Sequence, residues 1–375
     1  MNLPLLSLVS FFGYFMSSVI DSSSSFNTWL SNQSNFTQEL SSKTAYNRNF
    51  LYVKHSNIED KDWKLTVNKF SGFHSDVFDN YYKGYKPSKD LERTEFKYTT
   101  IQTPKNLDWR NSTIVGPIKD QKQCGSCWAF SAVSALESQV MKVLRKAVSL
   151  SEQDMVDCVK NIGTMDCCDG CMGGEMYAVY EYLLQSQNGS DDTEKQYPYK
   201  AVDQNCNSVP STINNVKITN FVSLPVGNED AMQKALYHVG PLSVGVNANQ
   251  DWQLYDKGIY NPSEDQCSSD PADQDHGVVV VGYGSEKGLD YWIIRNSWGK
   301  NWGEDGYMRL ARGKNACGVA NSVIYPVVTK TFEQNQCLNS HPECPSEVCY
   351  TDCPCACFIP SGVSPCLCSA ATCSC

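Results

Sequence analysis

The sequence is short of basic residues, of histidine and, beyond its first twenty residues, of long apolar runs. Its 375 residues carry 31 Lys and Arg against 41 Asp and Glu, which gives a net charge of −10. No broad basic field is therefore available to hold nucleic acid or an anionic membrane surface. Without a second long apolar run, no later segment is expected to span a bilayer, so we expect no membrane partner in the mature chain. Five histidines leave few candidates for a general base.

Residues 3–20 form the one long apolar run, with no charged side chain before Asp21. The run is typical of a signal-peptide core, although the positive flank is supplied by the α-amine alone. The alternative is an uncleaved anchor helix of marginal length. We predict a signal peptide over residues 1–20 and a lysosomal or secreted product. Four sequons would then accept glycans, at Asn32, Asn35, Asn111 and Asn188.

Cysteine is absent from residues 21–103, which indicates a unit separate from the rest of the chain. Nine cysteines lie in residues 104–331 and ten more in residues 332–375. So many cysteines favour disulfides in an oxidising compartment. We therefore divide the chain into a leader at 1–20 and units at 21–103, 104–331 and 332–375.

Hydrophobic periodicity indicates helices first and strands later, an α+β protein with two lobes. Residues 21–103 have apolar side chains at helical spacing, followed by an alternating run at 65–70 that predicts a strand. Residues 127–146 fit an amphipathic helix. Short β-branched or aromatic runs at 242–246, 278–281 and 291–294 predict strands.

Cys127 is the candidate nucleophile. It would begin the helix at 127–146, where unpaired backbone amides and the helix dipole favour a thiolate. A protonated imidazole nearby would stabilise that thiolate further. The alternative is a redox or structural pair with Cys124. The flanking Trp128 and the upstream Gln121 favour the peptidase interpretation, and no cofactor or metal is expected.

His276 is the candidate base, because His55, His74 and His341 lie outside residues 104–331. His238 has the pattern of an ordinary helix-end histidine, whereas His276 opens a buried strand between small residues. An imidazole needs a partner on its second nitrogen, and Asn296 supplies one without adding charge. The alternative for Asn296 is a surface residue beside core tryptophans.

Attack on a peptide carbonyl makes an oxyanion that needs preorganised donors. The backbone amide of Cys127 is one such donor. The carboxamide of Gln121, six residues upstream, is the other.

These segments resemble the papain-like cysteine peptidases, the family of papain and cathepsins L, B and K. The segment around Cys127, CGSCW, has the local signature of the papain and cathepsin nucleophile. His276 follows Cys127 by 149 residues, inside the family's interval, whereas Asn296 follows by 169, which turn-rich insertions explain. The likeness runs from about 104 to 328 and includes the motifs at 108–110, 150–153, 157–158, 170–174, 197–199 and 324–327.

The resemblance implies a papain-like two-lobe fold, with a helical lobe, a β-barrel-like lobe and a cleft between them. It implies the disulfides Cys124–Cys171, Cys158–Cys206 and Cys267–Cys317. The pairing of Cys167 and Cys168 stays open between a vicinal bridge and a rearrangement with their neighbours.

The same resemblance places the substrate. Gly173 and Gly174 would present backbone to an extended peptide. The side chain two residues before the scissile bond, the P2 residue, would lie in a pocket that takes Leu, Val or Phe rather than Arg. The expected substrate-binding residues are Gly173, Gly174, Met176, Gly245, Gly277, Trp298 and Ser322. Met172 and Glu175 depart from the residues usual beside this glycine pair, which leaves fine specificity open.

Residues 21–103 resemble the family's inhibitory propeptide in part. Asn68 and Phe70 stand where expected, but Thr66 and Gly72 replace the flanking Gly and Asp. We expect a mainly helical propeptide that covers the cleft and is removed at low pH, when carboxylates protonate and ionic contacts weaken.

The tail at 332–375 holds Cys337, Cys344, Cys349, Cys353, Cys355, Cys357, Cys366, Cys368, Cys373 and Cys375. Five disulfides would staple so small a module, although repeated C-x-C steps also suit soft metals. Two other functions stay open, a non-catalytic relative that keeps the fold and a metal-binding protein dominated by this tail. The leading prediction is a monomeric cysteine endopeptidase, made as a zymogen, that acts on proteins or peptides.

Overall fold

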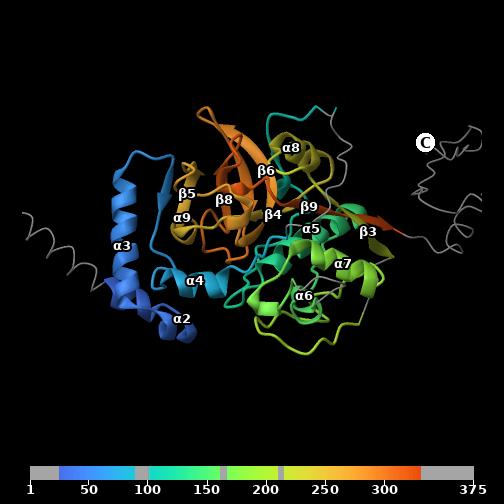
Figure 1. The fold of residues 1–375 in the computed structure, drawn as a ribbon, viewed down its shortest axis with the longest axis horizontal. Helices are drawn as coiled ribbons and strands as arrows, with labels where there is room; N and C mark the ends of the chain where they lie inside the picture. Colours follow the sequence, from blue (N-terminus) through green and yellow to red (C-terminus); the bar gives the residue numbers. More distant parts are fainter. Residues whose placement is uncertain (1–24, 89–99, 101, 161–166, 210–214, 331–375) are drawn as a thin grey trace, which may run out of the picture.

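The computed structural model describes residues 25–88, 100, 102–160, 167–209 and 215–330. The N-terminal segment, residues 25–88, contains α2 (Asn35–Leu40), α3 (Lys43–Ile58), β1 (Trp63–Leu65) and α4 (Ser75–Tyr82). Ser34 and Ser42 cap α2 and α3 by accepting backbone N–H groups at the first turn of each helix. In Figure 1 α3 stands at the edge of the molecule and α4 runs inward from it toward the larger body.

A helical lobe is built around α5 (Cys127–Leu144), which ends two residues before the predicted boundary. It also holds α6 (Glu152–Cys158) and α7 (Met176–Ser186). Trp128, Val133 and Leu136 of α5 pack in one buried cluster with Tyr180 and Leu183 of α7. Such a helix, apolar over much of its circumference, is stable only when buried between other elements, and α5 packs against α7, β6 and β9.

The second lobe is a mixed sheet whose strands follow the order β1-β5-β8-β7-β6-β4-β9-β3, with β2 paired to β6. Its central strand, β6, is buried over nine successive residues because β4 and β7 flank it and other elements cover both faces. The remaining bounds are β2 (Leu107–Asp108), β3 (Val216–Ser223), α8 (Glu229–His238), β4 (Leu242–Val246), α9 (Gln250–Leu254), β5 (Tyr255–Tyr260), β6 (His276–Glu286), β7 (Leu289–Arg295), β8 (Tyr307–Ala311) and β9 (Val323–Lys330). Short 3₁₀ turns lie at Trp109–Asn111, Gly170–Met172, Pro271–Asp273 and Ala316–Gly318.

The expected barrel-like closure is therefore corrected, since the described strands form an open sheet that ends at β1 and β3. The two lobes themselves agree with the α+β prediction, and Figure 1 shows α5, α6 and α7 beside the sheet.

The N-terminal segment extends this sheet. β1 pairs antiparallel with β5, and Trp63 lies opposite Gly258. The strand predicted at 65–70 is wrong beyond Leu65, because Asn68 starts a turn there. Its side-chain oxygen accepts the Phe70 N–H at 2.9 Å, and its own N–H bonds the Ser71 hydroxyl.

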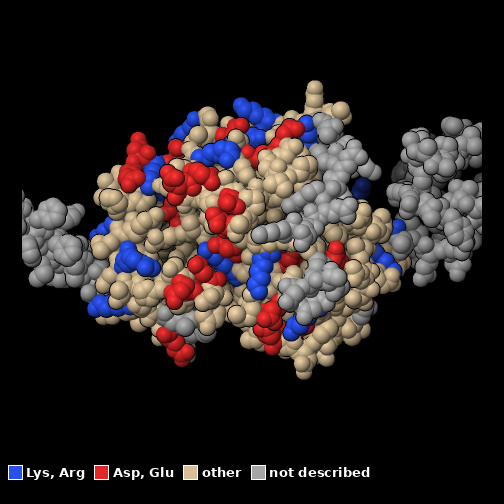
Figure 2. Space-filling model, in the orientation of Figure 1, with Lys and Arg blue, Asp and Glu red and all other residues tan. Residues whose placement is uncertain are grey.

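The face drawn in Figure 2 carries Lys and Arg scattered among Asp and Glu. None of the helices in the described ranges has the length and apolar character needed to cross a membrane.

Candidate active site

Cys127 occupies the first position of α5, fully buried, and is the free cysteine of the described residues. Backbone amides of Gly277, Trp128 and Tyr85 lie close to its sulfur, where they favour the charged form. The Trp128 amide belongs to the first turn of α5, whose unpaired donors favour a negative charge. The Gly277 amide comes from the other lobe, so the sulfur lies where the two lobes meet.

His276 is the first residue of β6 and is also fully buried. Its Nε2 lies 2.8 Å from Asn296 Oδ1, and its Nδ1 has no hydrogen-bond partner among the described residues. Trp298 stacks on the imidazole with ring centroids 4.5 Å apart. The amide and the indole therefore fix the ring, and one nitrogen is left available. Gly277 permits the approach to α5, since a Cβ there would lie 3.0 Å from the Cys127 carbonyl oxygen.

Gln121 is held beside this pair. Its Oε1 accepts a hydrogen bond from Ser297 Oγ at 2.6 Å, and its Nε2 donates to the Cys124 carbonyl at 3.0 Å. The same Nε2 lies 3.3 Å from the carbonyl oxygen of Tyr82, which also accepts from Trp298 Nε1 at 2.9 Å. A carbonyl of the N-terminal segment thus engages the Gln121 carboxamide, one of the two donors expected for a substrate oxyanion.

The N-terminal segment crosses the cleft between the lobes immediately after α4. Gly174 donates its N–H to the Gly84 carbonyl and accepts the Lys86 N–H, so that Tyr85 forms a parallel bridge with Gly174. A Cβ at Gly84 would lie 2.1 Å from the Gly125 carbonyl oxygen, so the backbone approaches closely here. Access to Cys127 is closed in this state.

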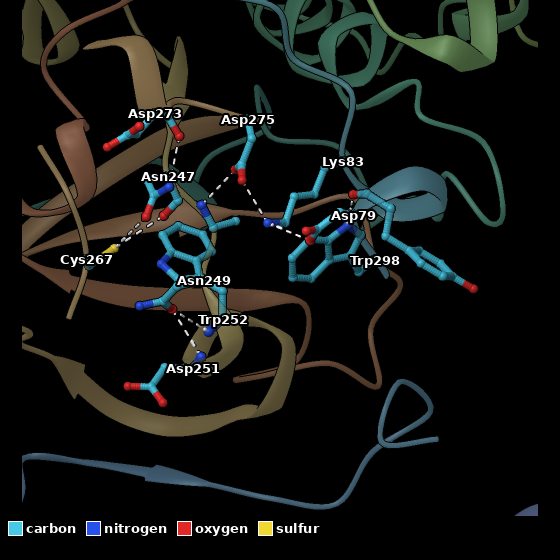
Figure 3. A network of polar contacts seen from close by, with 12 residues as sticks. Asp79, Lys83, Asn247, Asn249, Asp251, Trp252, Cys267, Asp273, Asp275 and Trp298 are labelled. Atoms are coloured by element: carbon cyan, nitrogen blue, oxygen red, sulfur yellow. Dashed lines mark hydrogen bonds and ion pairs between the residues drawn. The ribbon is translucent and has the colours of Figure 1, made fainter. Parts of the chain in front are cut away.

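A buried lysine holds the crossing segment, which is residues 82–88 of the N-terminal segment, in place (Figure 3). Lys83 Nζ lies 2.8 Å from Asp79 on α4 and 2.7 Å from Asp275, the residue before His276. Its side chain is 9% exposed, whereas those of Asp79 and Asp275 are 50% and 36% exposed. Asp275 also accepts the Ala248 N–H at 2.8 Å. This bond links the clamp formed by Asp79, Lys83 and Asp275 to the sheet lobe.

Burial keeps both reactive groups neutral in the covered state. Burial raises the pKa of the Cys127 thiol to about 12, an effect that the neighbouring amides only partly oppose. Burial lowers the pKa of His276 to about 3, against the hydrogen bond to Asn296, and the charge of Lys83 lowers it further. The thiolate–imidazolium pair expected from the sequence is therefore not the favoured form while the N-terminal segment is in place.

Four disulfides are present among the described residues. Three join the pairs that the resemblance implied, Cys124–Cys171, Cys158–Cys206 and Cys267–Cys317. The fourth is a vicinal bridge between Cys167 and Cys168. Cys124 is thus removed from redox pairing with Cys127, whose thiol stays free.

Most of the expected substrate-binding residues lie along the crossing segment. Gly174 bonds its backbone, and a Cβ added to Gly173 would lie 2.5 Å from the Gly84 carbonyl oxygen. A Cβ added to Gly245 would lie 2.5 Å from the ring of Tyr85. Behind this ring Ser322 bonds Gln274 at 3.0 Å. Met176 is fully buried, and its sulfur accepts a hydrogen bond from Ser243, so it supports the wall from the core.

Sequence reasoning missed four contributors to the site. Glu175 and Gln274 line the region of Tyr85, Asp275 holds Lys83, and the Tyr199 hydroxyl bonds both the Gln121 carbonyl at 2.7 Å and Ser126 at 2.6 Å. The departure of Glu175 from the usual residue was a signal for the first. The others became recognisable only when distant segments met.

Asn32, Asn111 and Asn188 are exposed, as glycosylation requires. The side chain of Asn35, the predicted signal peptide and the cysteine-rich tail with its alternatives lie outside the described residues.

The model of the papain family cysteine protease matches residues 103–327. A cathepsin L-like peptidase of Aedes aegypti is 40% identical over 284 residues, which cover 72% of this chain and 80% of that protein. Cathepsin L of Sarcophaga peregrina is 42% identical over 278 residues, 71% of this chain and 79% of that protein.

Solved precursors share the fold. The digestive procathepsin L2 proteinase of Tenebrio molitor larval midgut superposes with a TM-score of 0.71 at 30% identity, over 82% of this chain and 99% of that one. The proform of the ragweed pollen allergen Amb a 11 gives a TM-score of 0.66 at 33% identity, over 76% and 88%.

Fold, buried free thiol and covered cleft together define the precursor of a cysteine peptidase. The chain belongs to the papain family of cysteine proteases, and it is a cathepsin L-like endopeptidase synthesised as a zymogen. In this class of precursor the propeptide binds the protease domain, and the N-terminal segment does so here.

Proposed function

We propose that Cys127 is the nucleophile that hydrolyses peptide bonds. Its sulfur, as the thiolate, forms a bond to the carbonyl carbon, and the resulting oxyanion collapses with loss of the amine to leave an S-acyl enzyme. Water then attacks the acyl carbon, the C–S bond breaks, and the thiolate is regenerated. The observation that carries this proposal is a free sulfur at a helix start that lies beside the amide following His276.

His276 moves the protons of this reaction. As imidazolium it gives a proton from Nδ1 to the leaving amine, and it takes one from the attacking water. Asn296, 2.8 Å from Nε2, holds the ring, and Trp298 covers it. Gln121 Nε2 and the Cys127 N–H donate to the oxyanion once the Tyr82 carbonyl has left.

The described part of residues 21–103 acts as the inhibitor. It is anchored at the β1–β5 pairing and by the Lys69–Asp120 ion pair at 2.8 Å, and it passes through the cleft at 82–88. We assign 1–20 as signal peptide, 21–103 as propeptide, 104–331 as the catalytic domain and 332–375 as a cysteine-rich extension.

The P2 pocket is formed around Gly245, Gly277 and Ser322, with Met176 behind its wall. The absence of a side chain at Gly245 leaves room for a large apolar or aromatic residue. The site needs no cofactor, and the substrates are proteins or peptides. We place the product in the lysosome or outside the cell, as a monomer without nucleic-acid or membrane partners.

The test is active-site labelling of the acid-activated protein with an irreversible thiol-directed inhibitor. We expect one equivalent to attach to the wild-type protein with parallel loss of peptidase activity, and none to attach to Cys127→Ala. Full labelling of Cys127→Ala, or undiminished activity of that variant, would refute the assignment.

A further inference from the structure

Glu175 places a carboxylate inside the cleft, immediately after the glycine pair that holds the crossing segment. The residue is 2% exposed and caps the N-terminus of α7, where the Met176 N–H donates to its Oε1 at 3.0 Å. Its Oε2 accepts the N–H of Ser88, from the propeptide, at 2.7 Å. One carboxylate oxygen therefore caps the helix, and the other bonds the peptide that occupies the cleft.

Tyr85 of the propeptide shows what that carboxylate can recognise. The residue lies opposite Gly174, is 4% exposed, and carries its ring over Gly245. Its side chain hydrogen bonds Glu175, and this contact opposes the effect of burial, which raises the pKa of the Glu175 carboxyl to about 7. The phenol thus fills the pocket with its ring and meets an acceptor with its hydroxyl.

The other polar group beside the ring is already engaged. Gln274 donates its amide to the carbonyls of Gly245 at 2.6 Å and Gly318 at 2.9 Å, and its oxygen accepts from Ser322. A hydroxyl that enters this pocket therefore finds its acceptor at Glu175.

We propose that Glu175 is a specificity-determining residue, which makes the P2 pocket of the mature enzyme select tyrosine over phenylalanine. The inference rests on the proposed function, in which a substrate strand replaces the propeptide along Gly174. The residue directly opposite Gly174 directs its side chain into the same pocket whichever way the strand runs, because directly opposed residues of paired strands place their side chains on the same face of the sheet. A phenylalanine fills the pocket but leaves the buried Glu175 carboxyl without the phenol hydroxyl as its hydrogen-bond partner, and a site built around a substrate hydroxyl discriminates against its absence.

The test compares peptides that differ only at P2, with Tyr, Phe or Leu, on the acid-activated enzyme. For the wild type we expect kcat/KM for Tyr to exceed that for Phe about 10-fold, the effect of one buried hydrogen bond. Glu175→Leu should bring this ratio to about one or below and raise turnover of the Phe peptide. Glu175→Gln, which keeps the cap and one acceptor oxygen, should give an intermediate ratio. Glu181→Leu, on the same helix, is the matched control and should leave the ratio unchanged.

A second measurement leaves the catalytic domain intact. It probes the Tyr85–Glu175 contact in the full-length precursor with the substitution Tyr85→Phe, which also carries Cys127→Ala to prevent self-cleavage. Hydrogen exchange at the Gly174 amide measures how often the propeptide opens. Opening about 10-fold more frequent than in Cys127→Ala alone supports the contact.

The inference would be overturned by a wild-type Tyr-to-Phe ratio of kcat/KM of one or below that Glu175→Leu does not change. Turnover of the Leu peptide in the same experiment would still uphold the proposed function. Absence of turnover of all three peptides, together with failure of Cys127 to react with the inhibitor, would instead count against the proposed function.

Discussion

At the residue scale, burial in the covered cleft favours the neutral forms of both Cys127 and His276. A thiol with its pKa at about 12 and an imidazole with its pKa at about 3 are both neutral between these values. The sequence patterns predict which groups react, whereas burial in the folded precursor governs whether they are ionised. Inhibition therefore has an electrostatic part in addition to steric closure.

We predict that alkylation will separate the two states. In the precursor, iodoacetamide at pH 6 should modify Cys127 at least about 100-fold more slowly than in the activated enzyme, because only the thiolate reacts. The measurement is mass-spectrometric counting of the label on the Cys127 peptide, with Cys127→Ala as control. Equal rates in precursor and activated enzyme would contradict the burial effect.

Asn296 provides a second prediction at this scale. Asn296→Ala removes the oxygen that fixes His276, so we expect kcat to fall about 10- to 100-fold with little change in KM. Steady-state kinetics on a P2-Leu peptide check this. Asn315→Ala, at a 3₁₀ turn outside the site, tests for general effects of losing a half-buried, hydrogen-bonded amide, and a matching loss there would argue against a positioning role.

At the element scale the crossing between α4 and residue 88 joins the propeptide to both lobes. Phe70 and Phe78 pack edge-on against Trp298, while Lys83 reaches Asp275. Asp275 has its pKa raised by burial, and Lys83 only partly offsets this. A raised pKa means that protonation of Asp275 does not weaken the covered state, so the propeptide removal that we expect at low pH would draw on other carboxylates.

The clamp predicts the effect of Lys83→Met. Removing the ammonium leaves Asp275 buried without its partner, so the propeptide should bind more weakly, by about 10-fold given the partial exposure of both acids. The assay is inhibition of activated enzyme by added propeptide 21–103 with and without the substitution. Lys64→Met, whose ammonium contacts only carbonyls within the propeptide, is the control and should leave the inhibition constant unchanged.

At the scale of the whole molecule, buried carboxyl groups in the helical lobe link stability to acidic pH. Burial raises the pKa of Asp154 to about 6 and of Glu152 to about 7, although Lys119 opposes the shift of Glu152. Burial, reinforced by the charge of Asp154, raises the pKa of Asp191 well above its usual value. Between about pH 4 and these values the folded protein binds more protons than the unfolded chain.

Stability should therefore be greatest in acid and fall as the pH rises through 5 to 7. We predict that the melting temperature of the Cys127→Ala protein drops by about 5–10 °C between pH 5 and 8, a few degrees for each group. Differential scanning fluorimetry checks this. Asp191→Asn should flatten the profile, and a melting temperature that rises over this range would refute the prediction.

The sequence by itself determined the helix at Cys127 and the strands at 242–246 and around 278–281 and 291–294, and it predicts the reactive residue types. These follow from local periodicity and from chemistry with few candidates, such as five histidines. It did not determine the open edge of the sheet, the turn at Asn68, the neutral charge state of the reactive pair, or the meeting of Glu175 with Tyr85. Those depend on which segments come together and on how much water they exclude, and both are properties of tertiary structure because pairing and burial join residues far apart in the chain.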